Sequence, residues 1–285
     1  MRPWLRVFLG GLVLWAATVA VTAWTANSNL VPTVVLFGSF LIPVTFVVWA
    51  HGRDRSPVVT VELQFRAFVV GGVLGVLGAS LLESWLIRPS LLMYALVGLI
   101  EEGVKLAALM YVTRHAVRRS AKDGVVLGAT VGFGFAAFES SGYAFNALFT
   151  ADGLSLAQLV ETEILRGILA PVGHGLWTAI LGGVLFAAHG RLTGHVVWCY
   201  LGVSLLHALW DSMSAIAIAI TLVLTGRAWQ FELLRIGRVP HVSEWQVHVY
   251  TLVNWAGLIV ISLVALVWLW RVLHAARRET EIRPQ

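Results

Sequence analysis

Two adjacent acids and a base lie inside an apolar segment of this sequence. The stretch LVGLIEEGVKLAALMYV, residues 96–112, carries Glu101, Glu102 and Lys105 near its centre. Each charge at mid-membrane depth costs about 2.5–3.5 kcal/mol on insertion-based scales. On a helix, a Lys three or four residues after an acid can neutralise either acid of this pair. The group is therefore either a structural ion pair or one wall of a hydrolytic site in which a Glu activates water.

Further ionisable residues occur at similar depth in three later apolar segments. Glu139 lies in VGFGFAAFESSGYAF, His174 in PVGHGLW, and both His207 and Asp211 in SLLHALWDSMSA. His207 and Asp211 are four residues apart, so both side chains project the same way and the Asp can orient the ring. One shared polar cavity would hold all these groups. We predict a site built from Glu101, Glu102, Glu139, His174, His207 and Asp211, with Lys105 and Phe135 in supporting positions.

The elements that must position these residues are transmembrane helices. The chain has 285 residues, 58% hydrophobic and 12% charged, whereas soluble domains have about 25% charged residues. A spanning helix needs about 20 apolar residues. Eight segments qualify, near residues 4–25, 30–50, 67–87, 91–113, 124–148, 164–188, 196–221 and 248–271. We predict an all-α polytopic membrane helix bundle with about eight transmembrane helices.

The short connections indicate a single membrane domain over residues 1–285. Its motif-bearing core is expected at about 91–215, with helices one to three and eight peripheral. The segment 149–163 is expected to be an outer loop. Near the outer helix ends, Glu83 is expected to reach water or Arg88, and Arg166 to pair with Glu163 or reach the cavity mouth.

The basic residues indicate how the chain is oriented. With the N-terminus inside, fourteen of the 20 Arg and Lys residues fall on the cytoplasmic side and four on the outer side. This imbalance predicts cytoplasmic termini and a multi-pass protein of the cell membrane. It also explains the net charge of +5 without nucleic acid, so the expected partners are the lipid bilayer and a membrane-anchored protein substrate. No oligomeric state is predicted.

Three short motifs occur in order along the central segments. They are EExxK at Glu101–Lys105, FxxxE at Phe135–Glu139 and HxxxD at His207–Asp211. This ordered set resembles the PrsW family of intramembrane proteases, which shares a superfamily with the CAAX-processing and bacteriocin-processing proteases. The CAAX branch usually has His in the second motif, where this chain has Glu139.

The resemblance covers about residues 91–215 and also includes His174. It implies hydrolysis of peptide bonds in membrane-anchored regulatory proteins such as anti-sigma factors. Family members often have Asn after the Glu of the second motif, and this chain has Ser140 there.

The residues allow two hydrolytic mechanisms. In the favoured one no cofactor is needed: Glu102, slightly ahead of Glu101, is the base, and His207 stabilises the oxyanion or protonates the leaving amine. His174 and Glu139 would bind water or share these roles. In the other mechanism zinc is held by a Glu together with His174, His207 and Asp211, although the HExxH signature is absent.

Two non-enzymatic functions also place ionisable groups at mid-depth. A proton-coupled transporter would do so, as would a membrane scaffold that binds other helices. Transporters of this kind often show inverted repeats, and no internal repeat is evident in the sequence. The protease interpretation is therefore preferred.

Overall fold

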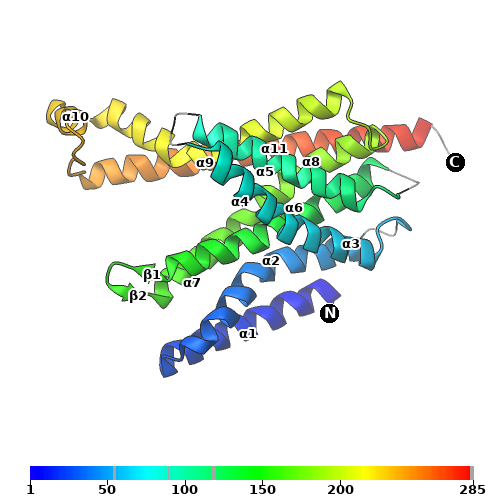
Figure 1. The fold of residues 1–285 in the computed structure, drawn as a ribbon, viewed down its shortest axis with the longest axis horizontal. Helices are drawn as coiled ribbons and strands as arrows, with labels where there is room; N and C mark the ends of the chain where they lie inside the picture. Colours follow the sequence, from blue (N-terminus) through cyan, green and yellow to red (C-terminus); the bar gives the residue numbers. More distant parts are fainter. Residues whose placement is uncertain (54–55, 89, 91, 117–119, 283–285) are drawn as a thin grey trace.

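The computed structural model describes residues 1–53, 56–88, 90, 92–116 and 120–282, most of them helical (Figure 1). Within these residues, seven helical spans are long and apolar enough to cross a membrane. One more helix, α5 (Met93–Val112), has 20 residues and carries the three charges of the EExxK motif. The predicted all-α polytopic bundle is confirmed. Arg55, Arg118, Arg119 and Arg283, which belong to the predicted cytoplasmic side, lie outside the described residues.

The helices run back and forth along one direction (Figure 1). Both termini lie at one end of the bundle, which we call the terminal end, and the end with the β-hairpin and α10 is called the far end. In chain order the elements are α1 (Pro3–Thr25), η1 (Ser28–Leu30), α2 (Val31–Arg53), α3 (Val61–Val69), η2 (Val70–Leu74), α4 (Gly75–Leu86), α5, α6 (Ala121–Ala147), β1 (Phe149–Thr150), β2 (Gly153–Leu154), α7 (Leu156–Leu169), η3 (Ala170–Val172), α8 (His174–Ala187), α9 (Gly194–Thr225), α10 (Ala228–Arg235) and α11 (Glu244–Ile282).

The helix predicted at 164–188 differs most from the structure. It begins at Leu156, because the Ser155 side chain accepts a hydrogen bond from the Gln158 backbone N–H and caps the first turn. The expected outer loop 149–163 is therefore a short hairpin followed by two turns of helix. The helix is also interrupted, since a 3-10 turn over Ala170–Val172 separates α7 from α8. Pro171 in this turn has no N–H to donate to the carbonyl four residues earlier, which favours a break at this point.

The backbones of α6 and α8 approach closely along a row of glycines. A Cβ atom added at Gly128 would meet the Thr178 carbonyl oxygen, and one added at Gly132 would meet that of His174. Glycines four residues apart let membrane helices pack at short distance. This contact presses the first turn of α8, which carries His174, against the helix that carries Glu139.

We expect Gly128→Ala to destabilise the protein by about 1–3 kcal/mol, because its methyl group has no room against α8. Gly142→Ala is the matched control on the same helix, since a Cβ there would meet nothing within 4 Å. Thermal unfolding of both variants in detergent measures the difference. Equal stability of the two variants would contradict the close packing.

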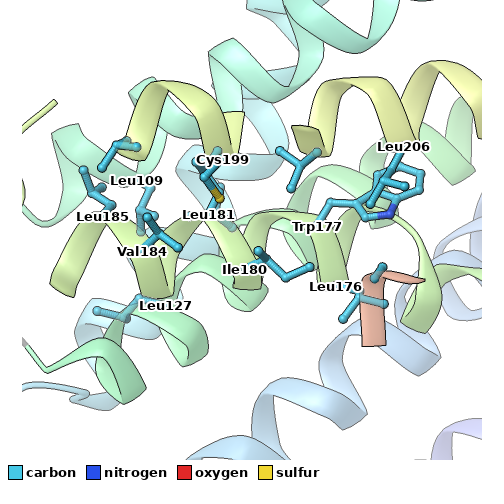
Figure 2. Close-up of a cluster of buried hydrophobic side chains, with 14 of the residues drawn as sticks. Leu109, Leu127, Leu176, Trp177, Ile180, Leu181, Val184, Leu185, Cys199 and Leu206 are labelled. Carbon is cyan, nitrogen blue, oxygen red and sulfur yellow. The ribbon is translucent and has the colours of Figure 1, made fainter. Parts of the chain in front are cut away.

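A packed apolar core fills the bundle between the site and the terminal end. Figure 2 shows Leu109, Leu127, Ile180, Leu181 and Leu185 together, and all five side chains are fully buried. They come from α5, α6 and α8, one to three turns closer to the terminal end than the ionisable residues on the same helices. The core therefore closes the site from that side.

Candidate active site

The predicted residues from α5, α6, α8 and α9 gather around one cavity of about 320 Å³. Glu101, Glu139, His174 and Asp211 line this cavity directly. Glu102, Lys105 and His207 lie in a layer behind them and are at most 1% exposed. Tyr94, Val97, Tyr143 and Arg166 also line the cavity and lie toward the far end on their helices, so the cavity extends from the site in that direction.

Lys105 links three of the predicted residues. Its Nζ atom lies 2.7 Å from Glu102 Oε1 and 3.5 Å from Glu101 Oε2. The same ammonium donates to His174 Nδ1 at 2.8 Å and lies 4.3 Å from the centroid of the Phe135 ring. The Phe135 ring thus covers one side of the ammonium in a cation–π contact. Lys105 balances the charge of the two buried acids of its own helix.

His207 lies between carboxylates on both sides of its ring. Its Nδ1 atom is 3.0 Å from Glu102 Oε1, and its Nε2 atom is 3.3 Å from Asp211 Oδ2 and 3.7 Å from Glu101 Oε2. A carboxylate bonded to one ring nitrogen fixes the orientation and tautomer of a histidine. The acid at Nδ1 is Glu102, whereas Asp211 and Glu101 share the side of the ring that faces the cavity.

His174 is held by one cation and one acid. An ammonium can only donate, so the Nδ1 atom of His174 is the acceptor of its bond with Lys105. Its Nε2–H is then the donor toward Glu139 Oε2, at 3.0 Å. His174 is the first residue of α8, so its position depends on the helix break at Pro171, which was not expected from the sequence.

Arg166 adds a cation at the mouth of the cavity. It forms an ion pair with Glu139, its Nε donates to Ser140 Oγ at 2.8 Å, and its guanidinium lies 4.2 Å from the centroid of the Tyr143 ring. Of the two expectations for Arg166, the cavity mouth is therefore the right one. Ser140, the residue after Glu139, serves as the acceptor that anchors this Arg.

Glu163 and Glu83 differ from their expected surroundings. Glu163 accepts a hydrogen bond from Trp15 Nε1 at 2.8 Å rather than pairing with Arg166. Glu83 lines the cavity from α4, and its Oε1 atom is buried with no hydrogen-bond partner among the described residues. The sequence did not predict that Glu83 lines the cavity, because this position depends on how α4 packs beside α5.

Three residues could together hold a metal ion. Glu101, His174 and His207 each offer a ligand atom, and these atoms lie within 4.8 Å of one another. Glu101 Oε2 is 3.8 Å from His174 Nδ1 and 3.7 Å from His207 Nε2, slightly wider than the roughly 3.4 Å expected between tetrahedral zinc ligands. The set fits zinc by donor type and spacing once Lys105 leaves His174 Nδ1. Of the ligands predicted from the sequence, Asp211 is not a member of this group.

Comparison with known proteins identifies related sequences. Residues 57–234 match a family model described as PrsW family intramembrane metalloprotease. A curated relative, Protease PrsW of Halalkalibacterium halodurans, is 27% identical over 163 residues, which cover 54% of this chain and 71% of that protein. No solved structure matches the chain. The matched range begins before the predicted core at residue 91 and includes α3 and α4.

Proposed function

The chain belongs to the PrsW family and is an intramembrane protease, and we propose that it cleaves membrane-anchored regulatory proteins by glutamate-based activation of water. Its substrates would resemble anti-sigma factors, and its location would be the cell membrane. The observation that carries the mechanism is the Glu101 carboxylate. It borders the cavity with Oε2 within 3.8 Å of both histidine rings.

Glu101 is the base in this proposal. Glu102 has the same chemistry, but it is 0% exposed and its Oε1 is bonded to Lys105 and His207. A general base must come within about 2.6–3.2 Å of the proton that it removes, directly or through one water. Glu101 lines the cavity in which water and substrate would lie, so we prefer it to Glu102, the residue that the sequence slightly favoured.

His207 and His174 would act on the substrate from the same wall. His207, held at Nδ1 by Glu102, presents Nε2 toward Glu101 and Asp211. His207 lies behind the cavity lining and is 1% exposed, so it would stabilise the oxyanion or protonate the leaving amine once Glu101 or Asp211 shifts away from Nε2. His174 and Glu139 would hold water and the scissile peptide, with Arg166 keeping Glu139 in place.

The shape of the bundle supports entry of water and substrate from the far end. The packed core of Figure 2 covers the terminal side of the site. The cavity instead continues past Tyr94 and Tyr143, which lie one to four residues from the far ends of α5 and α6. With cytoplasmic termini, the enzyme would cleave its substrates near the outer surface of the membrane.

A zinc-dependent version is the second candidate, and the Glu101, His174 and His207 group favours it. These residues would hold the ion, which would supply Lewis-acid polarisation of the scissile carbonyl. The metal-free version is preferred because the Lys105 ammonium already supplies a positive charge between Glu101, Glu102 and His174.

We expect purified protein to contain substoichiometric zinc and to retain cleavage after chelation. The physical reason is that Lys105 already bonds His174 Nδ1, one of the candidate ligand atoms. Elemental analysis and cleavage assays with and without chelator measure both quantities. Stoichiometric zinc together with chelator-sensitive cleavage would contradict the metal-free mechanism.

The function itself is tested by comparing membrane-protein fragments in cells that express wild-type protein or Glu101→Gln. Wild-type protein should generate fragments of single-pass membrane proteins that the variant does not. Identical fragment patterns at equal expression would refute proteolysis at this site.

A further inference from the structure

The charges around the cavity are unevenly balanced. Among the described lining residues four are acidic, and Arg166 is the one with a permanent positive charge; Lys105, behind the lining, is paired with Glu101 and Glu102. Arg166 is engaged by Glu139, while Glu101 and Asp211 both approach His207 Nε2. Glu83 alone among these acids has no ion pair or hydrogen bond from the described part of the chain, and its Oε1 is buried.

A buried carboxylate oxygen is costly unless a donor or cation meets it. Glu83 is only partly buried as a residue, and it borders the same cavity as Glu101. A group entering the cavity can therefore reach the exposed part of the Glu83 side chain, although Oε1 itself is buried. A lysine or arginine side chain suits the position, because its apolar stem can lie along Tyr94 and Val97 while its charged head meets the carboxylate.

A second unpaired group marks the same cavity. Trp177 lines it and is 0% exposed, yet its Nε1–H has no acceptor among the described residues. The ring lies beside His207, with ring centroids 4.8 Å apart. An indole N–H can only donate, and because Nε1 is buried a peptide carbonyl oxygen would reach it only after neighbouring side chains move. The unpaired acid farther out is therefore the group in this cavity that a basic side chain of the substrate would meet.

We propose that Glu83 forms a subsite for a lysine or arginine side chain of the substrate. This inference rests on the proposed function, and it adds a preference for substrates with a basic residue near the scissile bond. The site contributes binding and selectivity, whereas Glu101 acts on the reacting atoms.

The helix register indicates where the basic residue would lie. Glu83 is three residues from the far end of α4, and Glu101 is eight residues from the far end of α5. At about 1.5 Å per residue, Glu83 is roughly 7 Å closer to the far end. An extended peptide advances about 3.3 Å per residue. The basic residue is therefore expected about two residues from the cleaved bond, on the side toward the far end.

The test maps cleavage sites in the membrane proteins of cells that express wild type, Glu101→Gln, Glu83→Gln, Glu83→Lys or Glu161→Gln. Cleavage sites are the new protein termini that depend on Glu101. Glu161→Gln is the matched control, because Glu161 is an exposed acid of α7 that does not line the cavity. Detergent-purified samples of each variant are compared by size-exclusion chromatography to establish that they are folded.

Wild type and Glu161→Gln should both show Lys or Arg enriched at the expected distance. Glu83→Gln should cleave these basic sites about ten- to a hundredfold less, the loss expected for one charged hydrogen bond, and should still cleave sites without a basic residue. Glu83→Lys should shift the preference toward Asp and Glu. Unchanged cleavage-site sequences in Glu83→Gln would overturn the subsite alone, whereas absence of Glu101-dependent cleavage in wild type would overturn the proposed function as well.

Discussion

Glu101→Gln is expected to slow peptide cleavage by about 10²–10⁴-fold, the usual contribution of a general base. The amide keeps the size of the side chain but cannot take a proton from water. Because Glu101 lies at the cavity surface and its bond to Lys105 is long, at 3.5 Å, the variant should unfold at nearly the wild-type temperature. Initial cleavage rates of a purified membrane substrate and thermal unfolding in detergent measure the two effects.

Comparing the activity and stability of Glu102→Gln with those of Glu101→Gln shows which of the two acids is the base. Glu102→Gln weakens the short contact with Lys105 and the bond with His207 Nδ1, so it should reduce stability together with activity. If Glu102→Gln were inactive but normally stable while Glu101→Gln kept its rate, Glu102 would be the base. Glu161→Gln should match wild type in both measurements.

Lys105→Met is expected to destabilise the protein by about 3–5 kcal/mol, because it leaves the Glu102 carboxylate buried without its cation. Both side chains are 0% exposed, and 2.7 Å separates their charged atoms. At about 2–4 °C per kcal/mol for a chain of this size, the unfolding temperature should fall by roughly 10 °C. Thermal unfolding in detergent measures this change.

The double variant Lys105→Met/Glu102→Gln identifies the cause of that loss. Removing both charges should restore most of the stability, because an uncharged amide is far less costly to bury than a lone carboxylate. If the two single losses simply added, the ion pair would not be the source of the instability.

The fold could largely be predicted from the sequence, because apolar runs of spanning length allow few alternatives to helices. The common depth of the ionisable residues also placed the predicted site residues around one cavity. These conclusions depend on spacing along single helices. Pro171 and Gly173 indicate a helix break before His174. The apolar residues across 164–188 nevertheless favoured the prediction of one continuous helix.

Other features depend on how the helices rotate against one another. Adjacent residues of a helix point about 100° apart, so the sequence could not tell whether Glu101 or Glu102 faces the cavity. The carboxylate at His207 Nδ1 comes from Glu102 on α5, 105 residues earlier in the chain, rather than from the nearby Asp211. Arg166 and Glu83 join the cavity for the same reason, because packing of α7 and α4 brings them there.

The most direct test of the central claim is hydrolysis by purified, reconstituted protein in ¹⁸O-labelled water with a chelator present. The probe is a single-pass membrane protein whose fragments depend on Glu101 in cells, placed in the same liposomes. We expect wild type to release fragments with one ¹⁸O atom in each new carboxylate, and Glu101→Gln to release essentially none. Equal cleavage by Glu101→Gln, or no cleavage by wild type until zinc is restored, would contradict a glutamate-based intramembrane protease.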